Sequence, residues 1–145
     1  MKVSTKGRYA LRMLLYLAEH NADGFISLKE IAEKQNISKQ YLEQIVSLLN
    51  TSNIIRTSRG KQGGYMLAKE PSLCTVGQVL RITEGSLTPI SCLDDEINQC
   101  ERADFCLTLP MWQGLNKIIT EYLDGVTLQD ILEQYHERSA DNYVI

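Results

Sequence analysis

Two short amphipathic segments joined by a turn of about four residues, "QNIS", constrain the fold of this chain more than any other feature. In the first, "SLKEIAEKQ", Ser27 and Glu30 have the spacing of a capping box, so a helix is expected to begin near Leu28. In the second, "KQYLEQIVSLLN", Ser38 is a good N-cap, and the apolar side chains recur at helical spacing. The turn carries one apolar residue, Ile37. This pattern predicts a helix-turn-helix.

A basic, glycine-rich hairpin is expected directly after these two helices. The segments "IIRT" and "GYMLA" have the character of short strands, and the loop "SRGKQGG" lies between them. Gly60, Gly63 and Gly64 allow the loop to adopt positive φ. An N-terminal helix with one apolar face precedes the helix-turn-helix. Together these elements predict a winged helix.

The second half of the sequence predicts further helices and divides the chain into parts. Thr75 and Gln78 suggest a capping box at the start of "VGQVLRIT", and Gly85 is a plausible C-cap. A long apolar helix is expected from about 110 to 124, followed by a short one. The expected fold is therefore mainly α, a winged helix-turn-helix with a two-stranded wing and a long C-terminal dimerisation helix. The expected parts are a DNA-binding domain at 1–70, a connecting helix at 71–91, a cysteine loop at 92–108, and at 109–145 the dimerisation helix, the short terminal helix and the tail.

The long C-terminal helix has an apolar stripe that favours pairing with a second copy of the chain. Two-fold oligomers dominate among soluble homo-oligomers, and palindromic DNA sites favour dimeric readers. Packing of this helix on the N-terminal helix of the same chain is the alternative. The stripe consists of Trp112, Leu115, Ile118, Ile119 and Tyr122.

The net charge of -3 conceals an asymmetry between the two halves of the sequence. Residues 1–70 hold 11 Lys and Arg against 6 Asp and Glu, whereas residues 71–145 hold 4 against 12. Such a division indicates a nucleic-acid partner for the basic half, although scattered surface charge is the alternative. No run approaches the roughly 18 apolar residues of a membrane span. We therefore expect a cytoplasmic protein with reduced thiols and no membrane partner.

The beginning of the second helix of the helix-turn-helix holds the candidates for reading DNA bases. That end of a recognition helix enters the major groove, where Gln can bond bidentately to adenine and a carboxylate can accept from the cytosine amino group. Tyr41 has a core residue as its alternative role, and Glu43 a solvated one. The candidates are Lys39, Gln40, Tyr41, Glu43 and Gln44.

Basic residues outside this helix are candidates for contacts with the minor groove and the phosphates. An arginine on a narrow glycine-rich loop can reach into the minor groove, and phosphate contacts position a protein without reading sequence. A merely mobile hairpin is the alternative for the wing loop. The candidates are Arg59, Gly60 and Lys61 in the wing, and Lys6 and Arg8 near the N-terminus.

No enzyme site is expected. The two histidines, His20 and His136, are isolated in the sequence, and no nucleophile and base form a pattern. The stretch "GKQGG" lacks the spacing and the Lys-Ser/Thr ending of a phosphate-binding loop.

Three cysteines in one acidic loop, Cys92, Cys100 and Cys106, suggest a metal or iron–sulfur site. Their spacing lacks the close pairs of structural zinc sites, and a reducing setting and an odd number disfavour disulfides. Cys74 is more simply a small buried apolar residue. Cysteine sulfur holds iron–sulfur clusters, which favours a cluster or metal over unrelated free thiols. A fourth ligand would be needed, and the neighbouring acidic residues are candidates for it.

The chain resembles a known family over about 135 residues in order. The stretches that carry the resemblance are "STKGRYAL", "SKQYLEQIVSLL", "RGKQGGYMLA", "VGQVLRITEG", the three cysteines followed by "LTLPMW", and "LDGVTLQDIL". They resemble the IscR-type winged-helix regulators, a family that includes the nitric-oxide sensor NsrR and the cysteine-metabolism repressor CymR.

This resemblance implies a homodimeric, sequence-specific DNA-binding regulator, more often a repressor, that senses iron–sulfur, cysteine or redox status. It also implies an iron–sulfur cluster, 2Fe–2S rather than 4Fe–4S, on Cys92, Cys100 and Cys106, with an apo form that lacks it. The sequence departs from the IscR pattern at Leu109, where a histidine is usual, and leucine cannot bind iron. The fourth ligand is then an acidic loop residue, a residue of the partner subunit, or an exogenous thiol or water.

Two alternatives remain beside the cluster. The cysteines could act as thiol switches in a metal-free regulator. The C-terminal "NYVI" is similar to the tail of CymR-type repressors, which partner with cysteine synthase, so Ile145 could dock into that enzyme. A frayed terminus is the simpler interpretation of this tail.

Overall fold

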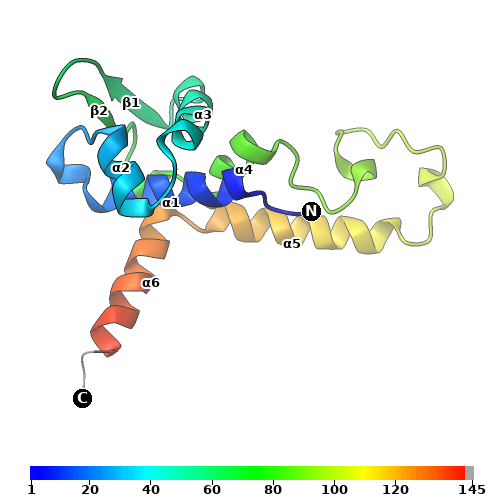
Figure 1. The fold of residues 1–145 in the computed structure, drawn as a ribbon. Coiled ribbons are helices and arrows are strands. Elements are labelled where there is room, and N and C mark those ends of the chain that lie inside the picture. The colour runs from blue at the N-terminus through cyan, green and yellow to red at the C-terminus, as the bar shows by residue number, and fades with distance from the viewer. Residues whose placement is uncertain (143–145) are drawn as a thin grey trace.

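A winged helix-turn-helix lobe occupies one end of the molecule, and a long helix and a loop extend away from it (Figure 1). The computed structural model describes residues 1–142. The predicted fold class, mainly α with a two-stranded wing, is confirmed. No helix within the described residues is long and apolar enough to cross a membrane. The main elements are α1 (Thr5–Glu19), α2 (Leu28–Gln35), α3 (Lys39–Thr51), β1 (Ile55–Ser58), β2 (Gly64–Leu67), α4 (Val76–Glu84), α5 (Leu109–Gly125) and α6 (Leu128–Asp141).

Side-chain caps start five of these helices where the sequence predicts them. Thr75 forms the expected full capping box with Gln78, because each side chain accepts a hydrogen bond from the backbone of the other residue. The box predicted for Ser27 and Glu30 is only half formed: Ser27 accepts from the Glu30 amide, but the Glu30 carboxylate accepts instead from the hydroxyl of Tyr16, at 3.1 Å. A partner distant in sequence therefore replaces the local one.

The helix-turn-helix is held together by its turn and by the core beneath it. Asn36 adopts the left-handed conformation at φ 54°, which ends α2, and the Ile37 amide donates to the carbonyl of Ala32 at 3.1 Å. Ile37 itself is buried. Most of the large fully buried side chains of this core come from α1, α2 and α3, and α4 and α6 add one each. They are Met13, Leu14, Leu17, Ile31, Leu42, Ile45, Leu49, Val79 and Leu128.

The wing is an antiparallel hairpin attached to the start of α2. Ile55 pairs with Leu67, and Ser58 with Gly64. Ile26, which precedes α2, exchanges two backbone hydrogen bonds with Tyr65, at 2.8 and 2.9 Å. A Cβ atom on Gly64 would collide with the Ile26 carbonyl, so glycine is needed for this close approach. The bridge at Ile26 has no local sequence signal, and sequence reasoning missed it.

Helix α4 connects the winged lobe to the C-terminal helices. Ahead of it, the Cys74 carbonyl accepts from the Leu128 amide at 2.9 Å, and the Val76 amide donates to the Val126 carbonyl at 2.8 Å. Near its other end, Arg81 forms a bidentate ion pair with Asp124 of α5, at 2.7 and 3.0 Å. Helix α6 starts on the core and then projects away from the body (Figure 1).

The ion pair between α4 and α5 predicts a pH-dependent stability. The Arg81 guanidinium, chiefly by hydrogen bonding, holds the pKa of the Asp124 carboxyl below its ordinary value. The stabilisation is therefore present above the unfolded-state pKa of about 3.9 and is lost as pH falls through the lower folded-state pKa. Because both side chains are about two-fifths exposed, Asp124→Asn should cost only about 0.2–1 kcal/mol at pH 7.

Urea unfolding at one fixed protein concentration, at pH 7 and at pH 3, measures this effect. The difference between wild type and Asp124→Asn should shrink at pH 3, and an equal difference at both pH values would contradict the assignment. Glu121→Gln is a suitable control, because Glu121 belongs to the longer and more exposed pair with Lys117, at 3.9 Å.

Candidate nucleic-acid interface and cysteine loop

The first turns of α3 present polar side chains to solvent. Ser38 caps the helix through its hydroxyl, which accepts from the Tyr41 amide at 3.1 Å. Leu42 and Ile45 point into the core and fix the rotation of the helix about its axis. The opposite face is exposed, and it carries four of the five predicted base-reading residues: Lys39, Gln40, Glu43 and Gln44.

Tyr41, the fifth of these residues, packs into the protein. Its ring is half-buried against the core and meets the ring of Tyr9 edge-on, with centroids 5.5 Å apart. Tyr41 therefore has a packing role, and because its side chain is only half-buried, base reading stays a prediction for it. The same contact places the first half of α1 beside the first turn of α3.

Lys6 and Arg8 lie on α1 within one turn of Tyr9. Arg8 is exposed, and its guanidinium donates to the hydroxyl of Thr5 at 3.1 Å. Lys6 is partly exposed. Their place next to Tyr9, and so next to α3, is compatible with the predicted phosphate contacts.

The wing loop exposes its basic residues around a tight turn. Gly60 has φ 105°, a conformation that favours glycine, and the Gly63 amide donates to the Gly60 carbonyl at 3.1 Å. Arg59 and Lys61 flank Gly60, and all three residues are exposed. The loop is thus shaped to carry one arginine and one lysine at its tip.

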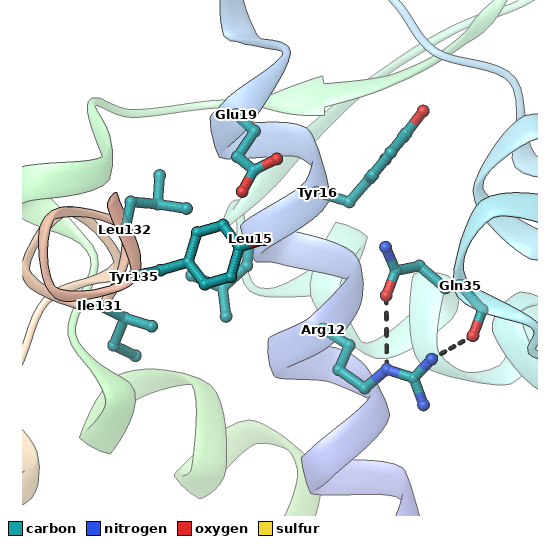
Figure 2. A pocket seen from close by; sticks show the side chains of 8 residues that line it. All are labelled: Arg12, Leu15, Tyr16, Glu19, Gln35, Ile131, Leu132 and Tyr135. Atoms are coloured by element: carbon teal, nitrogen blue, oxygen red, sulfur yellow. Dashed lines mark hydrogen bonds between the residues drawn. The ribbon is translucent and has the colours of Figure 1, made fainter. Parts of the chain in front are cut away.

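Arg12 forms a contact that sequence reasoning missed. Its guanidinium donates to the side-chain oxygen and to the backbone carbonyl of Gln35, the last residue of α2 (Figure 2). The same guanidinium lies over the Tyr9 ring, 5.1 Å from its centroid. Arg12 therefore ties α1 to the end of α2, immediately before the turn. A cleft of about 220 Å³ opens beside this contact, between α1 and the residues Ile131, Leu132 and Tyr135 of α6 (Figure 2).

The three loop cysteines lie on an extended loop that reaches past the beginning of α5 (Figure 1). All three are partly exposed free thiols. Within residues 1–142, no three His, Cys, Asp or Glu side chains come together in a way that could hold a metal ion. The structure thus places Cys92, Cys100 and Cys106 in one loop without bringing their sulfur atoms into one site.

The surroundings of Cys106 and Cys74 shift the pKa values of their thiols in opposite directions. The pKa of Cys106 is lowered, first by hydrogen bonding to the Thr108 side chain, with sulfur and oxygen 3.5 Å apart, and also by the charge of Arg102. Burial raises the pKa of Cys74. Cys74 is therefore an inert packing residue, as expected, whereas Cys106 is suited to act as a thiolate.

The donor set of the loop fits an iron–sulfur cluster, although the loop must rearrange to assemble it. Three partly exposed thiols are the ligands that such a cluster takes. The amide nitrogen of Asn98 is buried without a hydrogen-bond partner among the described residues, and a thiolate or sulfide could accept from it. Leu109 opens α5 and supplies no ligand atom.

Helix α5 has an exposed apolar face and no buried residue along its length. Its main neighbour is α4 rather than α1. Of the predicted dimerisation residues, Ile118 is 65% and Tyr122 69% exposed, and Leu115 is also exposed. Trp112 and Ile119 are half-buried. Met111 extends the exposed stripe by one turn toward the cysteine loop.

Comparisons with known proteins assign the chain to a group of regulators. Residues 3–134 match the model of the Rrf2 family, described as an iron-dependent transcriptional regulator. The chain is 38% identical to the HTH-type transcriptional regulator CymR of Bacillus subtilis, covering 99% of this chain and 98% of that protein. It is 37% identical to the regulator IscR of Yersinia enterocolitica, covering 97% and 88%.

Solved structures agree with this assignment. The structure of CymR, the global cysteine regulator of B. subtilis, matches with a TM-score of 0.76 at 36% identity, covering 92% of this chain and 98% of that one. T. potens IscR matches with a TM-score of 0.77 at 40% identity, covering 95% and 90%. The family resemblance predicted from the sequence is confirmed. So is the expectation that the protein is not an enzyme, because the relatives are transcription regulators.

Proposed function

The chain belongs to the Rrf2 family of transcription regulators. We propose that it is a homodimer that binds a palindromic operator and regulates transcription as a repressor. The observation that carries the proposal is the exposed polar face of α3, on a chain that also exposes a basic wing tip and an apolar stripe along α5. The proposal gives each of the four parts predicted from the sequence one role. DNA reading falls to residues 1–70, and the connection between the lobes to 71–91. Sensing of the iron–sulfur, cysteine or redox status falls to 92–108, and dimerisation to 109–145.

Base reading is assigned to the exposed residues at the beginning of α3. Lys39 and Gln40 are the first two residues of the helix and have no role in the core, so they are free to meet base edges. Arg59 at the wing tip is assigned to the minor groove, and Lys61, Lys6 and Arg8 to phosphates.

We expect base-reading and phosphate-contacting residues to differ in their salt dependence. Gln40→Ala should weaken binding to a duplex selected from a random-sequence library by about 1–3 kcal/mol and relax the preference at one base position. Arg8→Ala should weaken binding to all duplexes alike and reduce the salt slope by about one. Fluorescence anisotropy over a salt series measures both quantities.

Lys117→Ala is the matched control for loss of a positive charge, because Lys117 lies on α5, far from α3 in sequence, and is mostly exposed. Its affinity and salt slope should equal those of wild type. A flat salt response of the wild-type protein would contradict the phosphate contacts.

Dimerisation is assigned to the exposed stripe of α5. The exposed apolar residues of α5 recur at the spacing of one helix face: Met111, Leu115, Ile118 and Tyr122. An exposed apolar face of this length, on a helix without buried residues, is typical of a protein–protein interface. Two-fold pairing through one shared patch is the simplest closed arrangement.

A charge placed in the stripe should disrupt the dimer. Ile118→Asp is expected to shift the mass measured by light scattering toward that of a single chain and to weaken DNA binding, because the second half-site contact is lost. Gln113→Asp introduces the same charge on the opposite face of α5 and should leave the mass unchanged. A monomeric wild-type protein would rule out the assignment.

Sensing is assigned to the cysteine loop, with Cys92, Cys100 and Cys106 as ligands of an iron–sulfur cluster, 2Fe–2S rather than 4Fe–4S. The cluster would be present or absent according to the supply of iron and sulfide and the amount of oxidant. The half-exposed thiols, the lowered pKa of Cys106 and the similarity to IscR support this assignment.

Protein purified without oxygen should be coloured and contain iron and sulfide, and Cys100→Ala should be colourless. Cys74→Ala is the matched control: Cys74 is buried beside α4, so this variant should keep its colour. Absorption spectra and iron and sulfide content measure the outcome. Stoichiometric zinc without iron or sulfide would exclude the cluster.

The similarity to CymR favours a second candidate, a metal-free regulator that responds to cysteine supply or oxidation through the same thiols. Oxidant-dependent release of DNA by the metal-free protein distinguishes it from the cluster regulator. A tail that docks into cysteine synthase belongs to this candidate, but Ile145 lies outside the described residues. Equal recovery of that enzyme with and without the last three residues would exclude the docking.

A further inference from the structure

The last residue of α4 is hydrogen-bonded to the residue that caps the N-terminus of α1. One carboxylate oxygen of Glu84 accepts hydrogen bonds from both the backbone amide and the hydroxyl of Ser4, at 3.1 and 2.6 Å. Ser4 is at the same time the N-cap of α1, and its hydroxyl oxygen accepts from the Gly7 amide at 3.3 Å. The Ser4 hydroxyl therefore joins the end of α4 to the first turn of α1.

Glycine at position 7 makes this contact possible. A Cβ atom there would collide with the Glu84 carboxylate and would lie 3.1 Å from both the Leu80 and the Val3 side chains. Around the hydrogen bonds, Leu80 and Leu87 form a buried apolar cluster against which Val3 packs. The N-terminal segment is thus attached to the end of α4 by both polar and apolar contacts.

The same end of α4 is attached to the first part of the cysteine loop. The Asp94 carboxylate accepts from the hydroxyls of Ser86, at 2.5 Å, and Thr88. The Asp94 amide donates to the Ser91 carbonyl at 3.1 Å, which closes the turn that contains Cys92. A continuous set of contacts therefore runs from the Cys92 turn through residues 84–88 to the first turn of α1.

The far end of this set of contacts carries two of the proposed phosphate-contacting residues. Lys6 and Arg8 lie two and four residues after Ser4 on α1, close to Tyr9, whose ring touches Tyr41 at the beginning of α3. A change in the position of Ser4 would therefore move the first turn of α1 relative to the recognition helix.

We propose that Glu84 is a positioning residue that couples the cysteine loop to DNA binding through Ser4. When the Cys92 turn changes shape, the pull on residues 86–88 reaches Glu84 and changes how Lys6 and Arg8 meet the phosphates. The inference rests on the proposed DNA-binding function, and it names the contact through which the loop acts on that function. A coupling of this kind works in both directions, because linkage is reciprocal.

The test uses metal-free protein whose loop cysteines are alkylated with N-ethylmaleimide to alter the loop. Cys74 is only 2% exposed and stays unmodified, which mass spectrometry verifies. The quantity measured is the ratio of affinities of alkylated and unmodified protein for the library-selected duplex. Wild type should show a change of about fivefold or more, the usual lower bound of such coupling.

Three variants separate coupling from simple stabilisation. Glu84→Ala removes the acceptor, so its affinity ratio should fall to nearly one. Glu84→Gln keeps an oxygen that can accept both bonds and should restore the wild-type ratio. Glu70→Ala removes the same charge from an exposed position ahead of α4 and should also keep that ratio. Thermal unfolding establishes that each variant is folded.

A purely structural role for Glu84 would lower stability or affinity in Glu84→Ala and leave the ratio at its wild-type value, and that result would overturn the proposal. A wild-type ratio of one would overturn it as well, because the loop would then have no effect on DNA binding. If neither form of the wild-type protein bound DNA, the proposed function itself would fail, and the inference with it.

Discussion

The close contact of α1 with α4 at Gly7 determines how the rest of the molecule is arranged. Because glycine has no side chain there, the end of α4 can reach the N-cap of α1. The other end of α4 is bonded to the segment that joins α5 to α6, and Arg81 in between holds Asp124. One short helix thus contacts the winged lobe, the cysteine loop and the long helix.

The division of charge follows the same architecture. The basic half of the chain folds into the winged lobe, and the acidic half forms the loop and the C-terminal helices. In the proposed function, a duplex would be attracted to the first and repelled by the second, so the electrostatic field would orient the protein before any base is read. Changes in the acidic half must then act through contacts within the protein, because that half is not expected to touch DNA.

The cysteine loop combines reactive chemistry with little packing. Its thiols are partly exposed, and few apolar side chains are buried between α4 and α5, where Leu87 is an exception. A segment with so few buried contacts can change shape at a small cost in free energy. That property is compatible with the sensing role proposed for the loop.

The sequence by itself determined the helices, their caps and the winged helix-turn-helix, because periodic apolar residues, capping boxes and turn glycines act over a few neighbouring residues. It also identified the polar face of α3, the wing arginine and the three loop cysteines as candidates, and it offered Tyr41 both a core and a base-reading role. Only the tertiary structure decided the rest: Tyr41 against Tyr9, Ile26 paired with Tyr65, Glu30 with Tyr16, and Glu84 with Ser4. Each of these joins residues far apart in the chain, and such pairs leave no local pattern because they depend on how whole helices pack.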